Sequence, residues 1–125
     1  MSSEQSSKQT VLIVEDYAML RGILAQALAD EGFAVLTAET GEQALAIAST
    51  LEGQLDLVVT DVLLPVMDGL ELAAGLARLK TPPAVLFISG VTADRNMPGP
   101  LLSKPFGPSA FLEQVGRMLP SGQHH

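Results

Sequence analysis

Short apolar runs alternate along the chain with segments in which apolar residues recur every three or four positions. Strands are predicted at 10–15, 34–38, 56–60, 84–88 and 101–103, and helices at 17–31, 40–51, 69–80 and 108–119. The first run is apolar on both faces, which is typical of a central parallel strand. The alternation therefore predicts an α/β fold in which right-handed crossovers place helices on both faces of a parallel sheet.

Polar residues of a related chemical kind follow four of the predicted strands. Glu15 and Asp16 follow the first strand, and Asp61 follows the third. Ser89 and Lys104 follow the fourth and fifth strands. In open α/β sheets, ligands bind beyond the carboxyl ends of the strands. Three carboxylates, a hydroxyl and a lysine at these ends predict a site for a divalent cation and a phosphoryl group.

With these residues in this order, the chain resembles the receiver domains of two-component response regulators. The resemblance rests on the acidic pair, on Asp61, on Ser89, on Lys104-Pro105, and on the loop residues Pro65, Met67, Asp68 and Gly69. It implies a flavodoxin-like, doubly wound (βα)5 fold whose five-stranded parallel sheet has the order 2-1-3-4-5. The receiver domain is expected over 10–119. A disordered lead-in is expected over 1–9, and a tail that resembles a tag remnant over 120–125.

The resemblance also implies a role for each residue of the predicted site. Asp61 would accept the phosphoryl group as an acyl phosphate. Ser89 and Lys104 would bind that group, with a cis peptide bond before Pro105. The expected ligands of Mg²⁺ are Glu15, Asp16, Asp61 and the backbone carbonyl of Leu63.

Each of these residues also has a simpler interpretation. Asp61 could begin the turn before Pro65, since Asp is common at turn starts. Asp16 could cap the following helix instead of binding a metal. Ser89 and Lys104 could be an ordinary strand-end hydroxyl and a solvated surface lysine. The whole set in order favours the functional interpretation.

The segment before Lys104 departs from the receiver pattern in two ways. Receivers usually carry a fourth helix there, but the segment is short and contains Pro98 and Pro100, which end helices. The fourth helix is therefore expected to be short or absent. Leu101 stands where receivers normally have an aromatic residue whose rotation reports phosphorylation. The usual aromatic switch is thus not available to this chain.

Composition narrows the possible functions further. The chain of 125 residues fits one domain, and it contains no cysteine for disulfides or thiolate metal sites. The net charge of −7 argues against direct binding of nucleic acid. No apolar run approaches the roughly 18 residues that span a membrane, and the polar start lacks a secretory signal. A cytoplasmic location is expected.

Three functions compete for these residues. The first is a phosphoacceptor that takes phosphate from a histidine kinase or histidine phosphotransfer protein and changes affinity for a downstream protein partner. It would be a stand-alone receiver or a fragment of a hybrid kinase, of unknown oligomeric state. The second is an interaction module that works without phosphorylation. The third, a phosphatase of the haloacid-dehalogenase type, is disfavoured because Leu63 occupies the position of its second acid.

Overall fold

The computed structural model describes residues 8–90 and 97–119. Its sheet consists of β1 (Thr10–Val14), β2 (Ala34–Ala38), β3 (Leu57–Asp61), β4 (Ala84–Ser89) and β5 (Leu101–Ser103). The strands are parallel and lie in the order β2-β1-β3-β4-β5, which confirms the predicted order. The ends of β1 and β3 are therefore neighbours.

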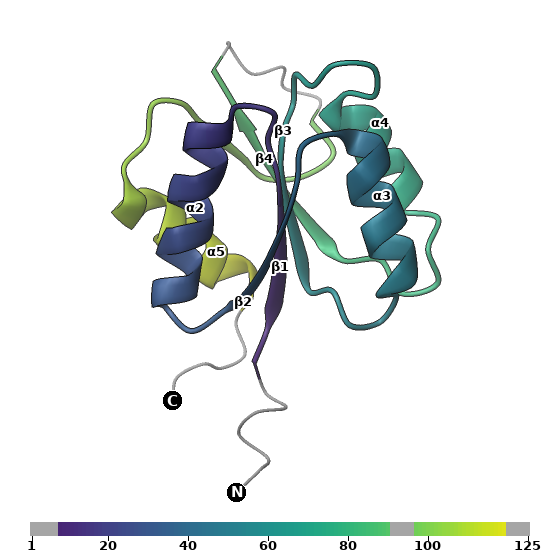
Figure 1. Cartoon of the computed structure of the whole chain (residues 1–125), viewed down its shortest axis with the longest axis horizontal. Helices are drawn as coiled ribbons and strands as arrows, with labels where there is room; N and C mark the ends of the chain where they lie inside the picture. The colour runs from purple at the N-terminus through teal and green to yellow at the C-terminus, as the bar shows by residue number, and fades with distance from the viewer. Residues whose placement is uncertain (1–7, 91–96, 120–125) are drawn as a thin grey trace, which may run out of the picture.

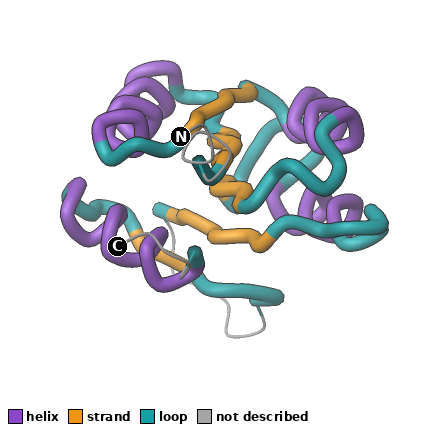
Figure 2. Tube along the Cα trace, turned by 90° about the horizontal axis from the view of Figure 1, so that it is seen from below, coloured by secondary structure: helices purple, strands orange, loops and turns teal. Residues whose placement is uncertain are grey.

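Four helices of the described residues cover the two faces of this sheet. They are α2 (Ala18–Asp30), α3 (Gly41–Thr50), α4 (Gly69–Leu76) and α5 (Pro108–Met118). Helices α2 and α5 lie on one side of the sheet, and α3 and α4 lie on the other (Figure 1). Figure 2 shows the resulting three layers, with the strands between the helices. In the part of the chain that is described, no helix is long and apolar enough to cross a membrane.

The core has two halves because successive residues of a strand point to opposite faces. Val11 and Ile13 belong to the cluster under α2 and α5, together with Phe111 and Val115. The alternate residues of β1, Leu12 and Val14, belong to the cluster under α3 and α4, together with Ala44, Ala48, Leu72 and Leu76. All of these side chains are buried. Burial on both faces explains why the sequence of β1 is a continuous apolar run.

Local signals in the sequence set several helix ends. The Thr40 hydroxyl accepts a hydrogen bond of 3.0 Å from the Gln43 N–H at the start of α3. Asp68 and Glu71 form a capping box at the start of α4, in which each side chain accepts from the other's backbone N–H. Gly32 follows α2 with a φ of +95°, which is the backbone conformation that favours glycine.

Two expectations about the helices were wrong. The helix predicted over 69–80 ends at Leu76, because the N–H groups of Arg78 and Leu79 donate three residues back and so tighten the last turn. Ile23, which the periodicity places on the inner face of α2, is 52% exposed.

Several expectations fall on residues outside the described ranges. These are most of the disordered lead-in and all of the tail. The expected absence of a fourth helix also rests mainly on residues 91–96, which are not described. Within the described neighbouring positions, 97–100, there is no helix.

Candidate functional site

The carboxyl ends of three strands bring two acids and a hydroxyl to one edge of the sheet. Asp61 is the last residue of β3, where it lies opposite Ile88, and it is 7% exposed. Glu15 directly follows β1, is 1% exposed, and donates its backbone N–H to the Ala38 carbonyl at 3.1 Å. Ser89 ends β4 and is also buried. The predicted sequence positions thus lie at adjoining strand ends.

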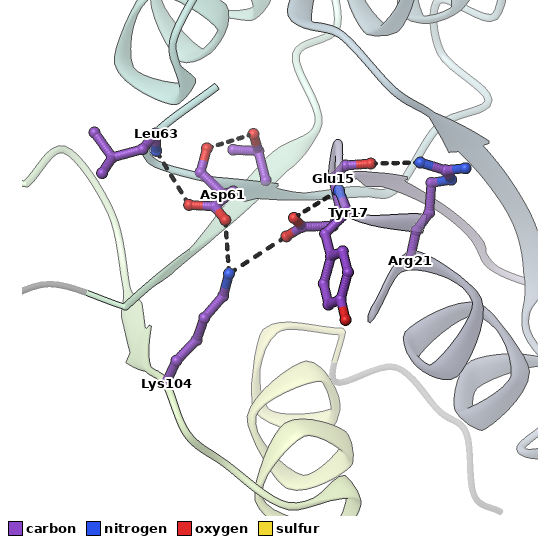
Figure 3. A network of polar contacts seen from close by, with 7 residues as sticks. Glu15, Tyr17, Arg21, Asp61, Leu63 and Lys104 are labelled. Atoms are coloured by element: carbon purple, nitrogen blue, oxygen red, sulfur yellow. Dashed lines mark hydrogen bonds and ion pairs between the residues drawn. The ribbon is translucent and has the colours of Figure 1, made fainter. Parts of the chain in front are cut away.

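Lys104 connects the two buried carboxylates. Its Nζ lies 2.7 Å from Asp61 Oδ2, where it donates a hydrogen bond, and 3.6 Å from Glu15 Oε1 (Figure 3). Its backbone N–H donates to the Ser89 carbonyl at 2.7 Å, which anchors the start of the loop to β4. The peptide bond between Lys104 and Pro105 is cis, as expected.

Backbone donors hold the other oxygen of each carboxylate. The Tyr17 N–H donates to Glu15 Oε2 at 3.1 Å, and the Leu63 N–H donates to Asp61 Oδ1 at 3.1 Å. Both acids are therefore oriented by a backbone amide two residues further along the chain. This arrangement directs Glu15 Oε1 and Asp61 Oδ2 toward the ammonium group of Lys104 (Figure 3).

The electrostatics of the site favour a further positive charge. Burial and, to a lesser extent, the negative charge of Asp61 raise the pKa of Glu15 to about 7, although the Tyr17 N–H and the charge of Lys104 act to lower it. Burial lowers the pKa of Lys104, but its hydrogen bond to Asp61 and the charges of both carboxylates outweigh that effect and raise it. One ammonium thus balances two adjoining carboxylates.

Asp16 is not buried with Glu15 and Asp61. The residue directly follows Glu15 in the chain, and its side chain is exposed. The residue that caps α2 is Tyr17, without a side-chain hydrogen bond, so the interpretation of Asp16 as the helix cap is wrong. Across residues 8–90 and 97–119, no three acidic, histidine or cysteine side chains are gathered as a metal-binding group.

The chemistry of the buried donors nevertheless fits a divalent cation. Glu15 Oε1 is buried and accepts no hydrogen bond, and the Lys104 ammonium lies 3.6 Å away, beyond hydrogen-bond distance. Carboxylate oxygens are the ligands that Mg²⁺ prefers, and Mg²⁺ keeps several waters when it binds one or two of them. Glu15 and Asp61 supply such a pair, and the exposed Asp16 lies next to it in the chain.

Comparison with known proteins settles the family. A sequence model of the response regulator receiver domain matches residues 11–115. The chain belongs to this family. Its members are the phosphoacceptor domains of two-component systems, so the resemblance inferred from the sequence is confirmed.

Curated relatives contain this receiver domain as one part of a longer protein. The chain is 35% identical to the sensor kinase CckA of Brucella abortus (strain 2308) over 125 residues, which covers 94% of the chain and 13% of the kinase. It is 28% identical to the transcriptional regulatory protein ResD of Bacillus subtilis (strain 168), which covers 93% of the chain and 50% of ResD. The chain thus spans half or less of the length of these relatives.

Solved structures agree with the fold at the level of the whole domain. The receiver domain of the hybrid histidine kinase CckA superposes with a TM-score of 0.79 and 34% identity, over 88% of this chain and 98% of that one. The chemotaxis response regulator CheY4 of Vibrio cholerae gives a TM-score of 0.79 and 30% identity, over 90% and 99% of the two chains.

Sequence reasoning missed three features of this receiver domain's site. The Tyr17 and Leu63 N–H groups orient the carboxylates of the two buried acids. Backbone donors cannot be recognised from a pattern of side chains. Arg21 donates from Nη1 to the Glu15 carbonyl at 2.8 Å. The helical spacing of Arg21 after the acidic pair was the one signal that could have drawn attention to it.

Proposed function

We propose that this receiver domain accepts a phosphoryl group on Asp61 from a phosphohistidine of a histidine kinase or a histidine phosphotransfer protein. The observation that carries the proposal is the contact of 2.7 Å between Lys104 Nζ and Asp61 Oδ2 at the end of β3. A lysine that donates to one buried carboxylate balances its negative charge and supplies a cation for the incoming group.

The reaction requires little beyond positioning and charge. An Asp61 carboxylate oxygen attacks the phosphorus atom, the bond between phosphorus and the donor imidazole nitrogen breaks, and the nitrogen keeps the electron pair. Lys104 then pairs with an oxygen of the acyl phosphate in place of the free carboxylate. The Ser89 hydroxyl at the end of β4 donates to another phosphoryl oxygen.

Mg²⁺ is the cofactor of this proposal. Glu15, Asp16, Asp61 and the backbone carbonyl of Leu63 would hold it. When bound, the ion neutralises negative charge on the transferring phosphoryl group. Support comes from Glu15 Oε1, which is buried and accepts no hydrogen bond, and from the position of the Leu63 backbone, whose N–H already contacts Asp61.

Phosphorylation would switch the affinity of the domain for a downstream protein partner. The domain would work in the cytoplasm, either alone or as part of a hybrid histidine kinase. Its own chemistry would be limited to self-phosphorylation from small phosphodonors and to self-dephosphorylation. Direct binding to nucleic acid is not expected, because the chain carries a net charge of −7.

One observation favours a second candidate, an interaction module that works without phosphorylation. Leu101 begins β5 opposite Phe87, at the position where the family carries a rotating aromatic residue. A leucine cannot donate a hydrogen bond from its side chain. A partner could then recognise the fold in a single state.

Mass spectrometry after incubation with acetyl phosphate and Mg²⁺ separates the two candidates. The wild-type protein should gain one phosphoryl group, and Asp61→Asn should gain none. Asp68→Asn is the matched control, because it alters an acid outside the site and asparagine also caps helices well. An Asp61→Asn protein that is still labelled, or a wild-type protein that never is, would contradict the phosphoacceptor function.

A further inference from the structure

Arg21 is a largely buried arginine beside the site. It lies in the first turns of α2, where its backbone N–H donates to the Tyr17 carbonyl at 3.0 Å. Only 18% of its side chain is exposed, and arginines rarely lie so deep without a partner. Its Nη1 donates to the Glu15 carbonyl at 2.8 Å, which supplies that partner (Figure 3).

This contact acts on the peptide unit between the two acids. The Glu15 carbonyl and the Asp16 N–H belong to one planar group, so fixing the carbonyl fixes the direction in which the chain continues into Asp16. Glu15 is also held by its N–H on Ala38 and by its Oε2 on the Tyr17 N–H. Arg21 adds a side-chain donor to these backbone contacts and so completes the restraint on the loop.

The second contact of the guanidinium group is weaker. Arg21 Nη2 lies 3.8 Å from Glu39 Oε2, and the Glu39 side chain is 68% exposed. Solvent screens such a pair, so it adds little to the orientation of Arg21. Glu39 therefore provides a control, because its removal alters the charge beside Arg21 and leaves the contact with the Glu15 carbonyl in place.

From these contacts we infer that Arg21 is a positioning residue for the cation site of this receiver domain. It holds the Glu15–Asp16 peptide at the point where the chain passes from the buried Glu15 side chain to the exposed Asp16 side chain. Among the described residues, the polar contacts of its side chain are to the Glu15 carbonyl and the Glu39 carboxylate, so it acts on the site through the loop backbone. The inference rests on the proposed function, since the ion that it serves is the Mg²⁺ proposed there.

The experiment compares Arg21→Ala, Arg21→Lys and Glu39→Gln with the wild-type protein. Tyr17 is the only tyrosine and the chain has no tryptophan, so intrinsic fluorescence reports on the residue beside the acidic pair during a Mg²⁺ titration. Arg21→Ala should bind Mg²⁺ about tenfold more weakly, as is typical when a residue that orients a metal ligand is removed. Arg21→Lys, which keeps a cationic donor group on a shorter side chain, should recover part of the loss, and Glu39→Gln should bind like the wild type.

Amide hydrogen exchange without Mg²⁺ gives an independent measurement. In Arg21→Ala, the Tyr17 amide should lose protection relative to the Val58 amide of β3, which corrects for any global loss of stability. If Arg21→Ala keeps wild-type Mg²⁺ affinity, or keeps the wild-type ratio of Tyr17 to Val58 protection, the inference is overturned. A wild-type protein that binds no Mg²⁺ contradicts the proposed function instead, and the exchange ratio then decides whether Arg21 positions the loop.

Discussion

Gly69, the first residue of α4, lies against the backbone carbonyl of Asp61. A Cβ atom at this position would clash with the Asp61 carbonyl oxygen and would lie 3.0 Å from the Cα atom of Val62. The Gly69 N–H also donates to the Val62 carbonyl at 2.9 Å. The start of α4 is thus packed directly on the strand end that carries the proposed phosphoacceptor. Only a residue without a side chain permits this approach.

Gly69→Ala should therefore destabilise the protein by about 1–3 kcal/mol, because backbone atoms cannot move aside as a flexible side chain can. Urea denaturation measures the free energy of unfolding. Gly22→Ala is the matched control. Gly22 lies inside α2, and a Cβ atom added there would have nothing within 4 Å, so alanine should stabilise the protein by up to about 1 kcal/mol. Equal stabilities of the two variants would show that the contact between Gly69 and Asp61 is not tight.

The arrangement of strands could be predicted because it follows from local signals. The continuous apolar sequence of β1 predicts burial on both faces. The polar residues that follow the apolar strands indicate one edge of a parallel sheet. The caps at Thr40 and Asp68 likewise depend on neighbours only three residues away. Such short-range patterns can be recognised in a single sequence.

The details of the site depend on contacts between distant segments and could not be predicted in the same way. Lys104 and Asp61 lie 43 positions apart, and the sequence does not show that Glu15 shares the same lysine. The exposure of Asp16 follows from the path of the backbone after β1, which Arg21 helps to fix. Side-chain patterns also carry no information about the Leu63 and Tyr17 amide donors.

Removing the lysine should destabilise the site in the absence of Mg²⁺. Lys104→Met leaves the carboxylates of Asp61 and Glu15 side by side without their cation, and the expected loss is about 1–3 kcal/mol at pH 8. Mg²⁺ should restore more stability to this variant than to the wild type, because it replaces the missing positive charge. Chemical denaturation with and without Mg²⁺ measures both effects.

Lys80→Met is the control for the loss of one positive charge, since Lys80 is exposed. It should change the free energy of unfolding by less than about 0.5 kcal/mol. If Lys104→Met behaves like Lys80→Met, the contact with Asp61 contributes nothing measurable to stability, and its proposed role in balancing the charge of the carboxylate loses its basis.

Glu15 should make the stability of the metal-free protein depend on pH. Its pKa is raised from 4.5 to about 7 in the folded state, so the folded protein binds more protons than the unfolded chain in that range. The contribution of Glu15 is therefore fully present below about pH 4.5 and is lost as the pH rises through about 7. A shift of this size corresponds to at most about 3 kcal/mol.

The measurement is the difference between the wild-type protein and Glu15→Gln in urea denaturation across this pH range. Glutamine cannot ionise, so its variant should lack the decline, and other titrating groups cancel in the comparison. Mg²⁺ should reduce the decline in the wild type, because it stabilises the charged form of Glu15. Parallel curves for the two proteins would show that Glu15 ionises normally in the folded state.

The lifetime of the acyl phosphate should depend on Leu63. This residue lies two positions after Asp61, its N–H contacts Asp61 Oδ1, and its side chain is 60% exposed. An apolar side chain at the edge of the site cannot hydrogen-bond a water molecule and so cannot orient one toward the phosphorus atom.

Leu63→Asn introduces both a donor and an acceptor at this position. We expect the variant to lose its phosphoryl group several-fold faster than the wild type, as followed by mass spectrometry after removal of the phosphodonor. Leu70 is also an exposed leucine, but it lies on α4, and the acyl phosphate of Leu70→Asn should decay at the wild-type rate. Equal decay of Leu63→Asn and the wild type would mean that water reaches the acyl phosphate without help from this side chain.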